Sequence, residues 1–228
     1  CVIIDAGHSS PASLVQSHIG SPGVGSFTSA VTDIHVAKNA NLTYCKVQSE
    51  AADSFHYGRI QSSQMEDSCV THFDFSCGSS LARNELHARL DGERAEVHLN
   101  GLYAVKDRQH IDNRTIVDHK VPCCYSRQCY KGILNNTSRA VFNGTIIVQP
   151  GAVNTDGVQL NKNLLLSRDA RVYTKPQLEI LNNDVKCTHG ATTGQINEEH
   201  LFYAMSRGIN QEEAIAMLAR GFVEDILY

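Results

Sequence analysis

Residues 1–195 contain short runs in which apolar and polar side chains alternate, and Gly, Asn, Asp and Ser separate one run from the next. The clearest runs span residues 42–47, 69–75, 97–99 and 145–148. Alternation with a period of two is the pattern of β-strands, and almost nothing here has the longer period of an amphipathic helix. The pattern therefore predicts an all-β core over residues 1–195.

A loose repeat runs through this core: a small residue, any residue, then an apolar residue. Its units begin at Ala12, Ala40, Ser68, Ala95, Ala140 and Ala170, with steps of 28, 28, 27, 45 and 30 residues. The long step could hold two shorter turns, with residues 115–117 between them. Such a repeat predicts a β-solenoid whose stacked coils share one core, with each small residue at a corner and each apolar one pointing inward. A β-sandwich with evenly spaced strands is the alternative.

Residues 196–228 predict a helical hairpin instead. Asn197 suits the N-cap of a first helix, Gly208 suits its end, and Asn210 suits the cap of a second helix. The second helix has an apolar stripe at steps of 3, 4 and 4 residues, formed by Ile215, Leu218, Phe222 and Ile226. We expect one face of the hairpin to pack on the last coil of the solenoid.

Other side chains of the hairpin are candidates for binding a partner. Leu201 and Met205 lie four residues apart on one face of the first helix, and Met217, Arg220 and Glu224 lie off the apolar stripe of the second. These five positions are our candidate partner-binding residues. A plain end cap for the solenoid is the alternative role of the hairpin.

Composition narrows the class of protein. The 228 residues are 42% hydrophobic and 19% charged, with a formal net charge of −4, which fits a globular chain of one or two domains. No apolar run approaches the ~20 residues of a membrane span, and no basic cluster indicates nucleic acid as a partner. Phosphate-loop and dinucleotide fingerprints are absent from the sequence, so we expect no nucleotide site in this chain. Because the chain starts at Cys1, directly in a strand-like run, we expect that an N-terminal part of the protein is missing.

The eight cysteines include no Cys-x-x-Cys pair. Cys123, Cys124 and Cys129 form the one local cluster, and its spacing fits no standard zinc site. Since the chain is long enough to form a core without covalent cross-links, we expect reduced, mostly buried thiols rather than disulfides.

Residues 184–195 carry the most suggestive chemistry. If residues 185–189 are extended, Cys187 and His189 point to the same face, and a thiolate beside an imidazole suits iron, zinc or copper. Two ligands do not complete a site, so others must come from another coil or another chain. A buried thiol beside a histidine bonded to backbone is the alternative, and the two side chains are not aimed as a nucleophile with its base. A second candidate is an acid–base cluster of Asp112 with Asp118 and His119, as in polysaccharide-cleaving solenoids.

Ten stretches carry a further signal: residues 83–86, 100–103, 117–119, 130–134, 142–144, 161–167, 175–180, 184–192, 202–203 and 206–209. In this order, over essentially the whole chain, they resemble the SufB/SufD family of the SUF iron–sulfur cluster assembly system, and most of all its SufD branch. Residues 123–129 have more thiols than this likeness leads us to expect, and residues 154–160 match only in part.

The resemblance implies a right-handed parallel β-helix followed by a short C-terminal helical domain, and an N-terminal helical region that this chain lacks. It implies a scaffold subunit, without enzymatic activity, that pairs with a SufB-like subunit or forms a homodimer in isolation. A SufC-type ATPase would bind the C-terminal helices. A transient iron–sulfur cluster would form at the SufB–SufD interface, where this chain contributes His189 and, as the lesser candidate, Cys187. The location implied is the cytoplasm, or the plastid stroma in a photosynthetic eukaryote.

Two other functions stay open. A secreted β-helix carbohydrate-active enzyme would have disulfides and a groove of carboxylates, and a homo-oligomeric structural β-solenoid would assemble with copies of itself.

Overall fold

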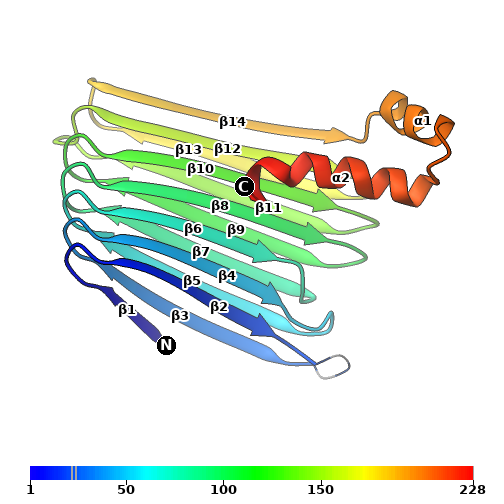
Figure 1. The fold of residues 1–228 in the computed structure, drawn as a ribbon, viewed down its shortest axis with the longest axis horizontal. Helices are drawn as coiled ribbons and strands as arrows, with labels where there is room; N and C mark the ends of the chain where they lie inside the picture. Colours follow the sequence, from blue (N-terminus) through cyan, green and yellow to red (C-terminus); the bar gives the residue numbers. More distant parts are fainter. Residues whose placement is uncertain (22, 24, 228) are drawn as a thin grey trace.

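The computed structural model describes residues 1–21, 23 and 25–227, which form a parallel β-solenoid followed by two helices (Figure 1). Each coil contributes one strand to each of two seven-stranded parallel sheets. Sheet A contains β1 (Val2–Ala6), β3 (Phe27–Val36), β5 (Phe55–Gln64), β7 (Leu81–Leu90), β9 (His110–His119), β11 (Arg139–Val148) and β13 (Arg171–Ile180). Sheet B contains β2 (Pro11–Ile19), β4 (Asn41–Ser49), β6 (Cys69–Ser76), β8 (Glu96–Val105), β10 (Tyr125–Leu134), β12 (Thr155–Leu165) and β14 (Val185–Gln195). The predicted solenoid is confirmed.

One corner of the solenoid explains three of the six repeat units, whereas Ala12 and Ala140 lie within β2 and β11, so the expected corner position is wrong for these two. Ala40, Ser68 and Ala95 are buried immediately before β4, β6 and β8, and each follows a residue with positive φ. The apolar residues two positions later, Leu42, Val70 and Val97, are in register and buried in the core. The 45-residue step runs from the start of β8 in sheet B to Ala140 in β11 of sheet A, so it spans about one and a half coils rather than two shorter turns.

The cysteine cluster belongs to the same corner pattern. Cys123 has a φ of 61° and Cys124 is buried, so the pair takes the place that Asn39 and Ala40 take three coils earlier. Cys129 lies five residues further along β10, about 16 Å away at the usual strand rise. The expectation of mostly buried thiols is wrong, because only Cys124 is buried; Cys45, Cys69, Cys129 and Cys187 are half-buried, and Cys1, Cys77 and Cys123 are exposed.

Large aromatic side chains fit into the core because glycine faces them on the next coil. Tyr103 of β8 lies opposite Gly132 of β10, and Tyr130 of β10 lies opposite Gly101 of β8. A methyl group on either glycine would overlap the opposite ring. Each glycine therefore leaves the space that the tyrosine ring of the neighbouring coil fills.

The interior is partly polar, which the alternating pattern alone does not reveal. Lys46 of β4 is 2% exposed; its Nζ donates a hydrogen bond of 2.5 Å to Asn84 Oδ1 and lies 3.7 Å from the Asp74 carboxylate. A buried charge needs such partners, because the free energy of removing it from water is large. Imidazoles are buried as well: His56, His72 and His119 lie inside the stack.

The helical hairpin packs on the outer face of sheet B rather than on the last coil. α2 (Gln211–Leu227) contacts β8 and β10, and α1 (Glu198–Ser206) extends beyond the ends of the strands (Figure 1). Lys131 of β10 fixes α2 by donating hydrogen bonds to the Phe222 carbonyl oxygen, at 2.5 Å, and to the Asp225 carboxylate. The expected packing on the last coil is therefore wrong, and so is the end-cap alternative.

The predicted helix ends are confirmed. The Asn197 side chain accepts hydrogen bonds from the backbone N–H groups of Glu199 and His200, Gly208 has a φ of 89°, and Asn210 accepts from the N–H of Glu213. Within the described residues, neither helix has the length and hydropathy that a bilayer span requires.

The Tyr–Gly pairs predict that Gly132→Ala lowers the free energy of unfolding by about 1–3 kcal/mol, because the added methyl overpacks the core against Tyr103. Gly151→Ala is the matched control, since nothing lies within 4 Å of a methyl group at that position. Urea titrations of the two variants measure the difference. Equal stabilities would show that the coils can separate to accept the methyl group.

The buried imidazoles predict an acid-sensitive fold. Burial lowers the pKa of His56, His72 and His119 from 6.5 to about 4 each. Between pH 6.5 and 4 the unfolded chain therefore binds protons that the folded chain does not, so the free energy of unfolding falls as the pH drops through this window. His72→Gln should reduce the slope by up to about 1.4 kcal/mol per pH unit, measured by urea unfolding at several pH values. An unchanged slope in His72→Gln would contradict the assignment.

Candidate functional site

The last coil of the solenoid is open. Within the described residues, β14 pairs only with β12 and β13 pairs only with β11, so each of these strands has one edge without a hydrogen-bonded neighbour. An unpaired parallel edge presents backbone N–H and C=O groups to any strand that approaches it. Figure 1 shows β14 as the outermost strand of its sheet, leading directly into α1.

Cys187 and His189 both lie on this edge strand and share one face. They are in register with Gly157 and Gln159 of β12, which point into the core. Gln159 is fully buried because β14 covers it, whereas His189 is exposed because no further coil covers β14. The His189 imidazole therefore continues the column of inward-facing side chains that includes Gln159. It lies at the end of the stack, where this column meets solvent.

Cys187 lies deeper than His189. It is half-buried against the small apolar cluster of Ile146, Val148 and Ala152, and its Sγ packs over Gly157. Burial raises the pKa of the Cys187 thiol, and a hydrogen bond with the Gly157 backbone offsets part of that effect. The thiol is thus less available than the imidazole for contact with another molecule.

The pair does not form a complete metal site within this chain. Two residues apart on a strand, the Cα atoms of Cys187 and His189 are separated by about 7 Å. Within the described residues, no third Cys, His, Asp or Glu joins them in a compact group of donors. Further ligands would have to come from a second molecule at the open end.

The structure does not bring the candidate acid–base residues together. Asp112 forms an ion pair with Arg83 on the outer face of sheet A, whereas His119 points into the core from the far end of the same strand. Asp112 and Asp118 lie six residues apart, about 20 Å along β9, well beyond the spacing of paired glycosidase carboxylates.

Another group of side chains went unnoticed in the sequence. The donor atoms of Cys69, Glu96 and His98 all lie within 4.8 Å of one another on the outer face of sheet B. The relevant signal was the 27-residue step between Ser68 and Ala95, which puts Cys69 beside Glu96. That step was interpreted only as a corner repeat.

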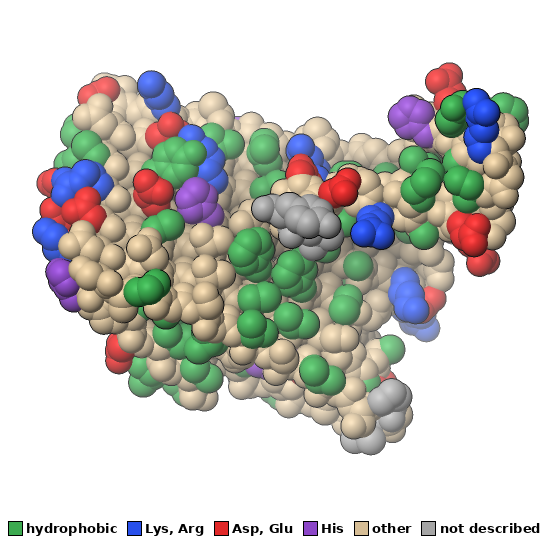
Figure 2. Space-filling view, in the orientation of Figure 1, with side chains coloured by type: hydrophobic (Ala, Val, Ile, Leu, Met, Phe, Trp, Pro, Cys, Tyr) green, Lys and Arg blue, Asp and Glu red, His purple; other side chains and the backbone are tan. Residues whose placement is uncertain are grey.

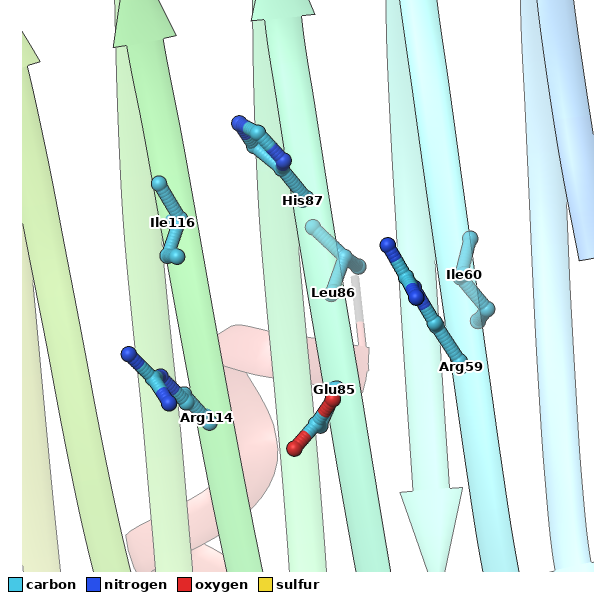
Figure 3. Close-up of a pocket in the computed structure, with 7 residues that line it drawn as sticks. All are labelled: Arg59, Ile60, Glu85, Leu86, His87, Arg114 and Ile116. Carbon is cyan, nitrogen blue, oxygen red and sulfur yellow. The ribbon is translucent and has the colours of Figure 1, made fainter.

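Charged side chains line a shallow depression on the outer face of sheet A (Figure 3). Arg59, Glu85 and Arg114 lie side by side on β5, β7 and β9 and are in register. The Glu85 carboxylate accepts a hydrogen bond from Arg83 at 2.7 Å and another from the Tyr57 hydroxyl at 3.1 Å. This carboxylate is therefore already engaged in structural ion pairing.

The candidate partner-binding residues of the hairpin are mostly exposed. Met205 and Met217 are 43% and 50% exposed, and Arg220 and Glu224 also face solvent. Leu201 is half-buried and lines a small hollow between the two helices and the loop after β12, so it belongs to the inside of the hairpin. Figure 2 shows α2 standing out from the sheet, with hydrophobic side chains gathered on the adjoining sheet surface.

Comparison with known proteins identifies the family of this chain. The family described as SUF system FeS cluster assembly, SufBD core domain, matches residues 1–222. The chain is 37% identical over 223 residues to the iron–sulfur cluster assembly protein SufD of Escherichia coli, an alignment that covers 98% of this chain and 53% of that protein. It is 33% identical to an iron–sulfur cluster assembly SufBD family protein of Synechocystis, over 88% of this chain and 44% of the relative.

A plant protein is similar to the same extent. The chloroplastic protein ABCI7 of Arabidopsis thaliana is 33% identical, over 94% of this chain and 46% of the relative. The chain thus spans about half the length of these relatives. Because the family match extends from the first coil into α2, the chain belongs to the SufB/SufD family of the SUF iron–sulfur cluster assembly system.

Proposed function

We propose that this chain is the core of a SufD-like scaffold subunit that pairs with a SufB-like subunit and a SufC-type ATPase, and that a nascent iron–sulfur cluster forms where the two scaffold subunits meet. In this proposal His189 is an iron ligand, Cys187 is an auxiliary thiol, and the chain has no enzymatic activity of its own. The observation that carries the proposal is the exposed imidazole of His189 on the unpaired edge strand of the solenoid.

The edge strand supports pairing with a second solenoid. The free side of β14 can continue its hydrogen bonds into the edge of a like subunit, which would cover the open core column. Such pairing would bring the partner's side chains beside His189 and supply the ligands that this chain does not provide. A neutral imidazole is a suitable ligand for iron, and together with thiolates from the partner it can complete a cluster site. In isolation, two copies of the chain could pair through the same edge.

The position of the hairpin supports a mechanical role. β14 ends at Gln195 and α1 begins at Glu198, so two residues separate the strand of His189 from the helices. A SufC-type ATPase bound to the exposed face of α2 would be linked to β14 through α1 and this short connection. When ATP binding draws two ATPase subunits together, the movement would pass through residues 197–228 and reshape the seam around His189 for the entry of iron and sulfide.

The proposal predicts that His189→Ala lowers the iron and acid-labile sulfide bound per reconstituted complex severalfold. The reason is that removal of the imidazole takes away a ligand without disturbing the backbone edge. Gel filtration should show the complex intact, and His8→Ala is the matched control because His8 is exposed at the other end of the solenoid. An unchanged cluster yield in His189→Ala would remove the proposed role, and Cys187→Ser tests the thiol separately.

The proposed helix interface predicts that Met217→Glu weakens binding of the SufC-type ATPase by about tenfold or more, since it puts a charge at the centre of an apolar contact. Met65→Glu is the matched control: Met65 is 46% exposed, close to the 50% of Met217, but it lies at a coil corner far from α2. Binding of the two variants is compared by titration calorimetry. Equal affinities would place the ATPase elsewhere.

A further inference from the structure

Cys69, Glu96 and His98 form a compact group at the corner where β6 and β8 begin. Cys69 and Glu96 are the first residues of their strands and lie opposite each other in the parallel ladder. His98 follows two residues after Glu96 and points to the same outer face of sheet B. Two adjacent strands therefore hold a thiol, a carboxylate and an imidazole in fixed register.

The three donor atoms have few competing partners. They all lie within 4.8 Å of one another, yet His98 Nε2 and the Glu96 carboxylate are 3.7 Å apart, too far for a hydrogen bond. Within the described residues, neither the Glu96 carboxylate nor the His98 ring hydrogen-bonds to another side chain. The three donor atoms thus lie close together, and no hydrogen bond joins the imidazole to the carboxylate.

The surroundings leave room for a positive charge. Arg127, which is in register with His98, stacks on the Tyr125 ring at 3.6 Å and pairs with Asp156 at 2.9 Å, so its charge is directed to β12. The negative charge of the Glu96 carboxylate, close to the Cys69 thiol, would attract a cation to this group.

We propose that Cys69, Glu96 and His98 bind a divalent transition-metal ion of the zinc type, with a water molecule as the fourth ligand. Sulfur, nitrogen and oxygen donors together select a borderline ion such as Zn²⁺ over Mg²⁺ or Ca²⁺, which prefer oxygen alone. The site is half-exposed, which gives an ion a direct route from solvent. It is separate from His189, because β10 and β12 lie between β8 and β14, a distance of about 14 Å.

The test is titration of the reduced chain with Zn²⁺ in competition with a chromophoric chelator. The Cys187→Ser/His189→Ala background removes the donors at the open end. We expect one Zn²⁺ per chain in this background. Cys69→Ser and His98→Ala should each lower the affinity by more than about 100-fold, since even loss of an outer-shell partner costs about 10- to 100-fold. Cys45→Ser is the matched control, because Cys45 is also half-buried on the outer face of sheet B but lies outside the group.

Two further measurements report on the Cys69 thiol directly. Zn²⁺ should slow alkylation of Cys69 and leave the alkylation of Cys45 unchanged, as followed by peptide mass spectrometry, and Co²⁺ should produce a thiolate charge-transfer absorption that Cys69→Ser abolishes. Stoichiometric Zn²⁺ binding that Cys45→Ser and Cys69→Ser retain equally would overturn the proposal. Equal protection of both thiols, or no bound Zn²⁺, would overturn it as well.

Discussion

The structure depends on one constraint: every strand of the solenoid must be in register with the strand one coil before it and one coil after it. In the middle of the stack this register satisfies the backbone on both sides and covers each inward side chain with the next coil, as Tyr103 is covered at Gly132. At β14 the constraint is met on one side only. The same column that buries Gln159 completely leaves His189 in contact with solvent. The exposed imidazole is thus a direct consequence of where the stack ends, and it needs no special local conformation.

Register also explains how the interior tolerates charge. Leu42 and Tyr44 of β4 point inward. Because side chains alternate between the two faces along a strand, Lys46 points inward as well. Its ammonium group lies near the Asp74 carboxylate on the next coil of sheet B and donates a hydrogen bond to Asn84 on the opposite sheet. Since one partner comes from each sheet, this contact is available only when both sheets are correctly stacked. A wrong register would leave the ammonium group buried without partners, so the polar interior disfavours misaligned coils.

The sequence predicted the elements better than their contacts. Alternation and caps identified the strands and helix ends because both signals are local, as at Asn197. The two-sheet arrangement was harder to predict, because the register step varies from 26 residues at Phe55–Leu81 to 32 at Arg139–Arg171. The group around Cys69 was missed because the 27-residue step between Ser68 and Ala95 was interpreted as a corner repeat and not as the register that places Cys69 beside Glu96. The docking of α2 was predicted wrongly because an apolar stripe does not say which surface it covers; its partner Lys131 lies more than 90 residues away in the sequence. The position of His189 on a strand with Cys187 was predictable, since two residues on one strand need no knowledge of register.

The helical hairpin connects two parts of the solenoid that differ in how firmly they are held. Its far end is fixed to β10, in the middle of sheet B, by the buried ammonium group of Lys131, and Val223 and Ile226 are buried there as well. Its near end joins β14, which is hydrogen-bonded along one side and whose inward side chains are only partly covered. A force applied to α2 therefore meets a rigid attachment at one end and a strand that is hydrogen-bonded along one side only at the other. Because local opening follows the lowest local stability, the displacement should appear at β14 rather than in the middle coils. The strand with the exposed imidazole is thus also the strand that the helices can move at the lowest free-energy cost.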